Sequence, residues 1–106
     1  MNKIKLKEGT VLREITPWTL FVLQRLMELS NSWSYSPTIT SANDGKHLPQ
    51  SYHYKNLAFD LRLFDLPLNR IDEFVKDVKD RLGSGCDVIL EKDHIHIEVS
   101  PSSPYL

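Results

Sequence analysis

The chain lacks the features that would place it in several large classes of protein. It has one cysteine among 106 residues, which excludes an intramolecular disulfide framework and a zinc site built from several cysteines. Its 13 basic and 14 acidic residues nearly cancel, so it has no basic excess of the kind that favours nucleic acid or anionic lipid. No segment reaches the roughly 18 apolar residues of a membrane span, and the charged N-terminus does not resemble a secretory signal. We therefore expect synthesis in the cytoplasm and neither a nucleic-acid nor a membrane partner.

The residues that are present predict one small α+β domain. The length suits a single core, so we expect one domain over 1–106, with its core at about 16–99. Apolar residues at helical spacing predict two main helices, at about 17–30 and 68–82. Alternating polar and apolar residues predict a strand at 57–64, and residues 3–8 suit a short edge strand or an ordered arm. A β-rich run predicts a short strand at 38–41, and 87–90 and 94–99 are expected to form a hairpin. Because helices and strands segregate, we expect a small antiparallel sheet with both helices packed on one face.

The single cysteine, Cys86, follows a turn-like Gly-Ser-Gly. A nucleophilic thiol needs a nearby histidine, cation or helix N-terminus that lowers its pKa, and the sequence gives no sign of one. We expect a free, half-buried thiol.

Histidine and acidic residues gather on the predicted strands. Side chains alternate along a strand, so His94, His96 and Glu98 should share one face while Ile95 and Ile97 point into the core. Asp60 should share a face with Arg62 on another strand, and His53 stands seven positions before Asp60.

Two histidines and a carboxylate form a common catalytic zinc set, with water as the fourth ligand. A further carboxylate must then accept the proton of that water, and Asp93 is the leading candidate, with Glu91 as the alternative. The same residues also have plainer interpretations. A histidine can simply be exposed or hydrogen-bonded, and Asp60 can pair with Arg62 at the surface.

Two motifs resemble those of a known family. The pattern Ser51-x-His53-x-x-x-x-Ala58-x-Asp60 resembles the SxHxxGxAxD signature of zinc D-Ala-D-Ala carboxypeptidases and L-alanyl-D-glutamate endopeptidases, whose fold the amino-terminal domain of hedgehog proteins shares. The pattern Asp93-x-x-His96 is similar to the second motif of that family. The resemblance covers about residues 38–99. The sequence there is similar to small members of the family that bacteriophages encode.

The resemblance implies a zinc peptidase that acts on the stem or cross-link peptides of bacterial peptidoglycan. It implies that His53, Asp60 and His96 bind zinc and that Asp93 is the general base. It also implies that substrate or transition-state contacts come from the side chains of His94, Ser51 and Arg62. A phage enzyme of this kind would be a monomer that reaches the cell wall after release, or a virion component beside other virion proteins.

The sequence departs from the family pattern at two places. Asn56 stands where the motif has glycine, and asparagine tolerates the left-handed backbone better than most residues. The arginine that many members carry after their Thr-Ser strand is missing, and Arg62 or Lys46 are the candidates to replace it. These departures keep open an alternative function, a non-enzymatic zinc-binding relative that serves as a phage structural, assembly or binding module. A metal nuclease is a weaker alternative, since the chain has no basic patch.

Overall fold

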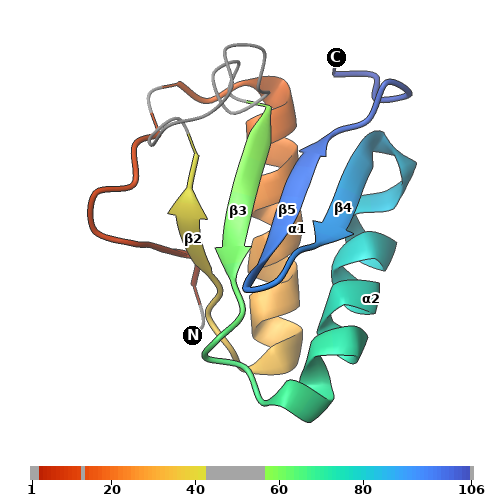
Figure 1. The fold of residues 1–106 in the computed structure, drawn as a ribbon. Coiled ribbons are helices and arrows are strands. Elements are labelled where there is room, and N and C mark those ends of the chain that lie inside the picture. Colours follow the sequence, from red (N-terminus) through yellow and green to blue (C-terminus); the bar gives the residue numbers. More distant parts are fainter. Residues whose placement is uncertain (1–2, 13, 43–56, 106) are drawn as a thin grey trace.

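The computed structural model describes residues 3–12, 14–42 and 57–105, and these form an α+β fold with a five-stranded sheet and two α-helices (Figure 1). The strands are β1 (Lys5–Leu6), β2 (Thr38–Ser41), β3 (Ala58–Arg62), β4 (Cys86–Leu90) and β5 (His94–Val99). The helices are α1 (Pro17–Trp33) and α2 (Ile71–Leu82), with short 3₁₀ turns at η2 (Leu68–Arg70) and η3 (Gly83–Gly85). No helix in the described part of the chain is both long and apolar enough to cross a membrane.

The strands are arranged in the order β1-β2-β3-β5-β4. The pairs β2–β3, β3–β5 and β4–β5 are antiparallel, as predicted, but β1 runs parallel to β2. The prediction of a wholly antiparallel sheet was therefore wrong, and the sheet is mixed. The reason lies in the connection, because the chain between β1 and β2 contains all of α1. A crossover that long can bring the second strand back in the same direction as the first.

The core lies between the helices and one face of the sheet. Phe59, Leu61, Ile95 and Ile97 are each at most 2% exposed, which confirms the predicted alternation along β3 and β5. Both helices lie on the same side of the sheet in Figure 1. The intervening side chains of β3 and β5 lie on the opposite face, which we call the polar face and which carries Asp60, Arg62, His94, His96 and Glu98.

Helix α1 begins as the sequence predicts but ends later. The hydroxyl of Thr16 accepts a hydrogen bond from the backbone N–H of Thr19 at 3.1 Å, and Pro17 follows at the first helical position. The predicted stop at the serine-rich stretch after residue 30 was wrong, because the Ser30 hydroxyl donates to the carbonyl of Met27 at 2.6 Å. This bond satisfies the hydroxyl within the helix, which continues to Trp33.

The second predicted helix is divided into two parts. Its first turn is the 3₁₀ segment η2, and α2 begins at Ile71. Two acidic residues in the first turn of α2 and two basic residues in its last turn complement the helix dipole. The predicted stop is confirmed at Gly83, whose φ of 71° suits glycine.

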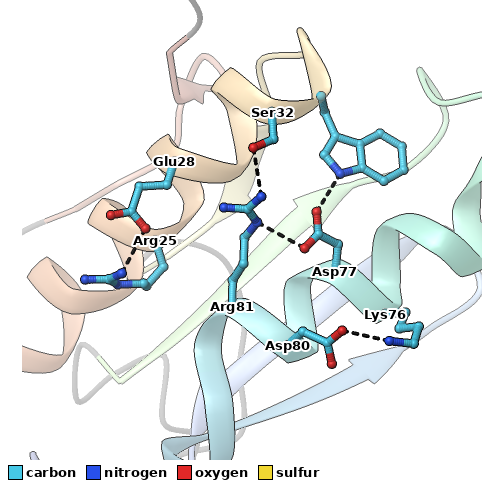
Figure 2. A network of polar contacts seen from close by, with 8 residues as sticks. Arg25, Glu28, Ser32, Lys76, Asp77, Asp80 and Arg81 are labelled. Carbon is cyan, nitrogen blue, oxygen red and sulfur yellow. Dashed lines mark hydrogen bonds and ion pairs between the residues drawn. The ribbon is translucent and has the colours of Figure 1, made fainter.

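A polar network joins the two helices (Figure 2). The carboxylate of Asp77 accepts hydrogen bonds from the indole of Trp33 at 2.7 Å and from Nε of Arg81 at 3.0 Å. The Arg81 guanidinium also donates to the Ser32 hydroxyl at 2.8 Å. Figure 2 shows Arg81 reaching between Ser32 on one helix and Asp77 on the other. Asp77 therefore organises the contact between the C-terminal half of α1 and α2.

Replacing Asp77 with alanine should lower the free energy of unfolding by about 1–3 kcal/mol, because it leaves partly buried donors on Trp33 and Arg81 without their acceptor. Asp80→Ala is the matched control on the same helix. The partners in its ion pair with Lys76 are 62% and 77% exposed, so the expected change is within about 0.5 kcal/mol. Urea denaturation of the two variants measures the difference. Equal losses would contradict a special role for Asp77.

Cys86 is a free thiol, as predicted, but it is buried rather than half-buried. Burial raises the pKa of the Cys86 thiol from an ordinary value of 9.0 to about 11. As pH rises above 9, the unfolded chain therefore loses its thiol proton before the folded chain does. The thiol's contribution to stability is complete below pH 9 and is lost between pH 9 and about 11.

Unfolding free energies at pH 8 and pH 10 test this expectation in the wild type and in Cys86→Ala. The wild type should lose about 1 kcal/mol more than the variant between the two pH values. The comparison cancels the titrations of all other groups, because both proteins retain those groups. An equal loss in both proteins would show that the thiol ionises normally.

Candidate functional site

The register of β3 and β5 determines which polar side chains meet. Asp60 lies directly opposite His96, and Arg62 lies directly opposite His94. Oδ1 of Asp60 is 2.9 Å from Nδ1 of His96 and 3.8 Å from Nε2 of His94. Residues that stand more than 30 positions apart in the sequence therefore converge on one carboxylate oxygen.

His96 lies between two carboxylates. Its Nδ1 bonds to Asp60, and its Nε2 bonds to Oε1 of Glu98 at 2.8 Å. The side chains of Asp60, His96 and Glu98 are 15%, 19% and 26% exposed, so water reaches them only partly. The hydrogen bond with Asp60 is the main cause that raises the pKa of His96 above its ordinary value. Burial opposes this shift, and Glu98 adds to it.

Asp93 and His94 form a second pair at the turn between β4 and β5. Nδ1 of His94 donates to Oδ1 of Asp93 at 2.8 Å. This hydrogen bond is the main cause that lowers the pKa of the Asp93 carboxyl, which is therefore ionised at neutral pH. The Asp93 side chain is 81% exposed. It is an exposed carboxylate whose Oδ1 bonds to the imidazole of His94.

Asp60 from the first pair and both residues of the second pair line a hollow of about 240 Å³ on the polar face, which we call the polar hollow. Its lining residues are Lys7, Thr40, Asp60, Arg62, Phe64, Asp93 and His94. Glu91, the alternative base in the sequence analysis, is not among them. Its backbone N–H closes the turn by bonding to the carbonyl of His94. The geometry therefore favours Asp93 over Glu91 as the carboxylate that serves this hollow.

Arg62 enters the polar hollow with unused hydrogen-bonding capacity. The carbon at the centre of its guanidinium lies 4.4 Å from the centre of the Phe64 ring, a cation–π distance. Its Nε is buried and has no hydrogen-bond partner among the described residues. The surface ion pair with Asp60 that the sequence left open does not form, since no ion pair of these two residues occurs within 4 Å. A buried donor of this kind gains from an anionic or carbonyl ligand.

The other sequence-predicted residues, Ser51, His53, Lys46 and Asn56, lie outside the described residues. Among residues 3–12, 14–42 and 57–105, no group of three or more His, Cys, Asp or Glu side chains could by itself hold a metal ion. The described part of the chain thus brings together two of the three predicted ligands, Asp60 and His96. Glu98 received no role from the sequence, although its position two residues after His96 already placed both on one face.

The two candidate ligands that the structure describes, Asp60 and His96, have donor types that zinc accepts. Zinc takes imidazole nitrogen and carboxylate oxygen at about 2.0–2.2 Å, so two ligand atoms of one tetrahedral ion lie about 3.3 Å apart. The observed 2.9 Å between Oδ1 of Asp60 and Nδ1 of His96 is a few tenths of an ångström shorter. Glu98 behind the ring matches the carboxylate that commonly orients a metal-binding histidine. The pair could therefore hold a divalent ion together with a third donor.

Comparison with known proteins adds no further constraint. No known protein family and no curated protein matches this chain.

The Asp60–His96 contact should stabilise the metal-free protein. In the presence of a chelator at pH 7, a double-mutant cycle with Asp60→Ala and His96→Ala should give a coupling energy of about 1–2 kcal/mol, because the bond is charge-assisted and partly buried. The control cycle uses the exposed pair Arg70–Glu73, with an expected coupling below about 0.5 kcal/mol. Urea denaturation supplies all the free energies. Additive effects at Asp60 and His96 would show that the two side chains do not interact.

Proposed function

We propose that the chain is a zinc metallopeptidase that hydrolyses peptide bonds in the stem or cross-link peptides of bacterial peptidoglycan. The observation that carries the proposal is the cross-strand pair of Asp60 and His96, which stands beside a hollow that Asp93 and His94 also line. The two sequence motifs that resemble the peptidase family end at these same residues. The α+β fold is compatible with the hedgehog-like fold of that family, which we include in the proposal.

Asp60, His96 and His53 would hold the zinc ion. Bound zinc would polarise the scissile carbonyl and make a bound water more acidic. Glu98 would hold the proton on Nε2 of His96, so that Nδ1 presents its lone pair on the side where Asp60 lies. The two carboxylates around His96 would thus have different tasks, one as a ligand and one as an orienting group.

Asp93 would act as the general base. His94 occupies one oxygen of the Asp93 carboxylate, which leaves the other oxygen to accept a proton from the attacking water. The water oxygen then bonds to the carbonyl carbon, the carbon–nitrogen bond breaks, and Asp93 returns the proton to the departing amine. The lowered pKa of Asp93 keeps this base ionised at neutral pH.

His94 and Arg62 would contact the reacting peptide. Nε2 of His94 lies on the side of Asp60, where it could contact the oxygen that becomes negative during attack. Arg62 has a buried donor with no partner in the described part of the chain, and the Phe64 ring holds its guanidinium. It would replace the family arginine that this sequence lacks. Ser51 would support the first ligand or contact the substrate.

The setting follows from the resemblance to small bacteriophage members. The protein would be made in the host cytoplasm and act on the cell wall after release, or as a virion component together with other virion proteins. It would work as a monomer and bind neither nucleic acid nor membrane.

A second function also has an observation in its favour. Each ring nitrogen of His96 bonds to a carboxylate, so the row Asp60–His96–Glu98 can stabilise the sheet without any reaction. A non-enzymatic zinc-binding relative, used as a phage structural, assembly or binding module, would keep this row and need no substrate-binding arginine.

Metal analysis and wall digestion separate the two functions. The purified wild type should contain about one zinc per chain, and His96→Ala should contain none, because it loses a ligand. Asp93→Asn should retain zinc but release new peptide ends from purified peptidoglycan at least about 100-fold more slowly, because asparagine cannot accept the proton.

The pattern of results identifies the function. Zinc in the wild type without cleavage would favour the non-enzymatic module. Cleavage by Asp93→Asn at the wild-type rate would remove Asp93 from the mechanism. A chain that binds no zinc would overturn both proposals.

A further inference from the structure

The turn that follows β3 carries a side chain of the polar hollow at its exposed tip. Leu63 and Leu66 are 3% and 8% exposed, and the backbone N–H of Leu66 donates to the carbonyl of Leu63 at 2.9 Å. The two residues between them, Phe64 and Asp65, are exposed to water. Phe64 lines the polar hollow, and the guanidinium of Arg62 lies over its ring. The place of this guanidinium therefore depends on how firmly the tip of the turn is held.

A hydrogen bond from a distant part of the chain reaches the tip of this turn. The hydroxyl of Tyr35 donates to Oδ1 of Asp65 at 2.7 Å, across 30 positions of sequence. A hydroxyl that donates to a carboxylate makes a stronger bond than one between two neutral groups. Because Asp65 directly follows Phe64 in the chain, the bond restrains the backbone that carries the Phe64 ring.

Tyr35 is itself held by the helices. It comes directly after Ser34, the C-cap of α1, whose φ of 49° is left-handed, and its backbone N–H donates to the carbonyl of Ser30 at 3.2 Å. Its ring packs edge-on against the buried ring of Phe74 on α2, with the two centroids 5.7 Å apart. Tyr35 therefore connects the turn after β3 to both helices.

Electrostatics place Arg62 close to the bond between Tyr35 and Asp65. Burial is the main cause that raises the pKa of the Tyr35 hydroxyl, and the bond to Asp65 adds to it, whereas the positive charge of Arg62 lowers that pKa. The hydroxyl therefore stays protonated and able to donate at neutral pH. Tyr35, Asp65, Phe64 and Arg62 thus form one series of contacts. It ends at the buried Nε of Arg62, which has no hydrogen-bond partner within the described ranges.

We propose that Tyr35 is a positioning residue for the polar hollow. Its bond to Asp65 fixes the turn, and the Phe64 ring on that turn holds the Arg62 guanidinium where its unused donor can meet a carbonyl or anionic group. The consequence for peptide cleavage rests on the proposed function, in which Arg62 contacts the peptide. The placement of Arg62 does not rest on that function and can be tested separately.

The NMR signal of the Nε–H group of Arg62 tests the placement without any reaction. The centre of the Phe64 ring lies 4.4 Å from the guanidinium carbon, so its ring current should shift this signal away from that of free arginine. Tyr35→Phe removes only the hydroxyl, and the signal should then move toward the free-arginine value. An Arg62→Lys variant identifies the signal, because it lacks it.

Arg25 supplies an internal control in the same spectra. Its guanidinium also lies over a phenylalanine ring, that of Phe21 on α1, at 5.6 Å from the centroid. This pair has no part in the turn after β3, so the Arg25 signal should stay in place in Tyr35→Phe. A general loosening of the protein would move both signals.

Two changes at Asp65 assign the effect to the hydrogen bond. Asp65→Asn retains an acceptor oxygen, so the Arg62 signal should stay close to its wild-type position. Asp65→Ala removes the acceptor and should act like Tyr35→Phe. The double variant should show no further change, because both substitutions remove the same bond.

Cleavage of a soluble synthetic stem pentapeptide by the zinc-loaded protein tests the consequence for function. Tyr35→Phe should lower kcat/KM by about fivefold, because the Arg62 donor is displaced from the peptide. The same substitution should have no effect in an Arg62→Ala background, since the residue through which it acts is gone. A purely structural role would lower activity in both backgrounds. Tyr105→Phe is the control on the C-terminal tail and should retain the wild-type kcat/KM.

The outcomes separate this inference from the function on which part of it rests. An unchanged Arg62 signal in Tyr35→Phe would overturn the positioning role. A shifted signal with unchanged kcat/KM, or an equal loss in both backgrounds, would overturn the role in cleavage. If the wild type cleaves no peptide, the proposed peptidase function fails, and the Arg62 signal alone decides whether Tyr35 positions this donor.

Discussion

The antiparallel register between β3 and β5 is the constraint on which the candidate site depends. It places Asp60 opposite His96 and, through the period of two, buries Phe59, Leu61, Ile95 and Ile97 under the helices. A shift of one residue in either strand would exchange these two sets of side chains. The burial that stabilises the sheet therefore also holds the polar row in place. The pairing of the two strands is therefore enough to bring Asp60 and His96 together.

The two neighbours of this strand pair extend the polar face in different directions. Strand β2 contributes Thr40 to the polar hollow, the turn between β4 and β5 contributes Asp93, and the first residue of β5 contributes His94. Paired strands therefore form one side of the hollow, and the short turn between β4 and β5 forms another. This combination suits the proposed site, in which the metal ligands must be held in place while the base accepts and returns a proton.

Much of this arrangement follows from the sequence, because local patterns determine it. Alternation predicted strand β3 and the opposite faces of β5, and the resemblance to the peptidase family implied the proximity of Asp60 to His96. The parallel direction of β1 was missed because a two-residue strand has almost no pattern, and its direction depends on the path of α1. The end of α1 was missed because the bond from Ser30 to Met27 depends on rotamer rather than composition. The predicted ligand His53 lies outside the described residues, so the third position of the ligand set remains a prediction.

The turn between β4 and β5 gives the molecule an asymmetric capacity for change. Within three consecutive residues it carries Asp93, which lines the polar hollow, and Glu91, whose backbone N–H closes the turn. An insertion in this turn would therefore displace Asp93 from the hollow. The connection between β3 and α2 contributes Phe64 alone to the lining of the hollow. Beyond Leu66, that connection should therefore tolerate changes in length that the turn does not.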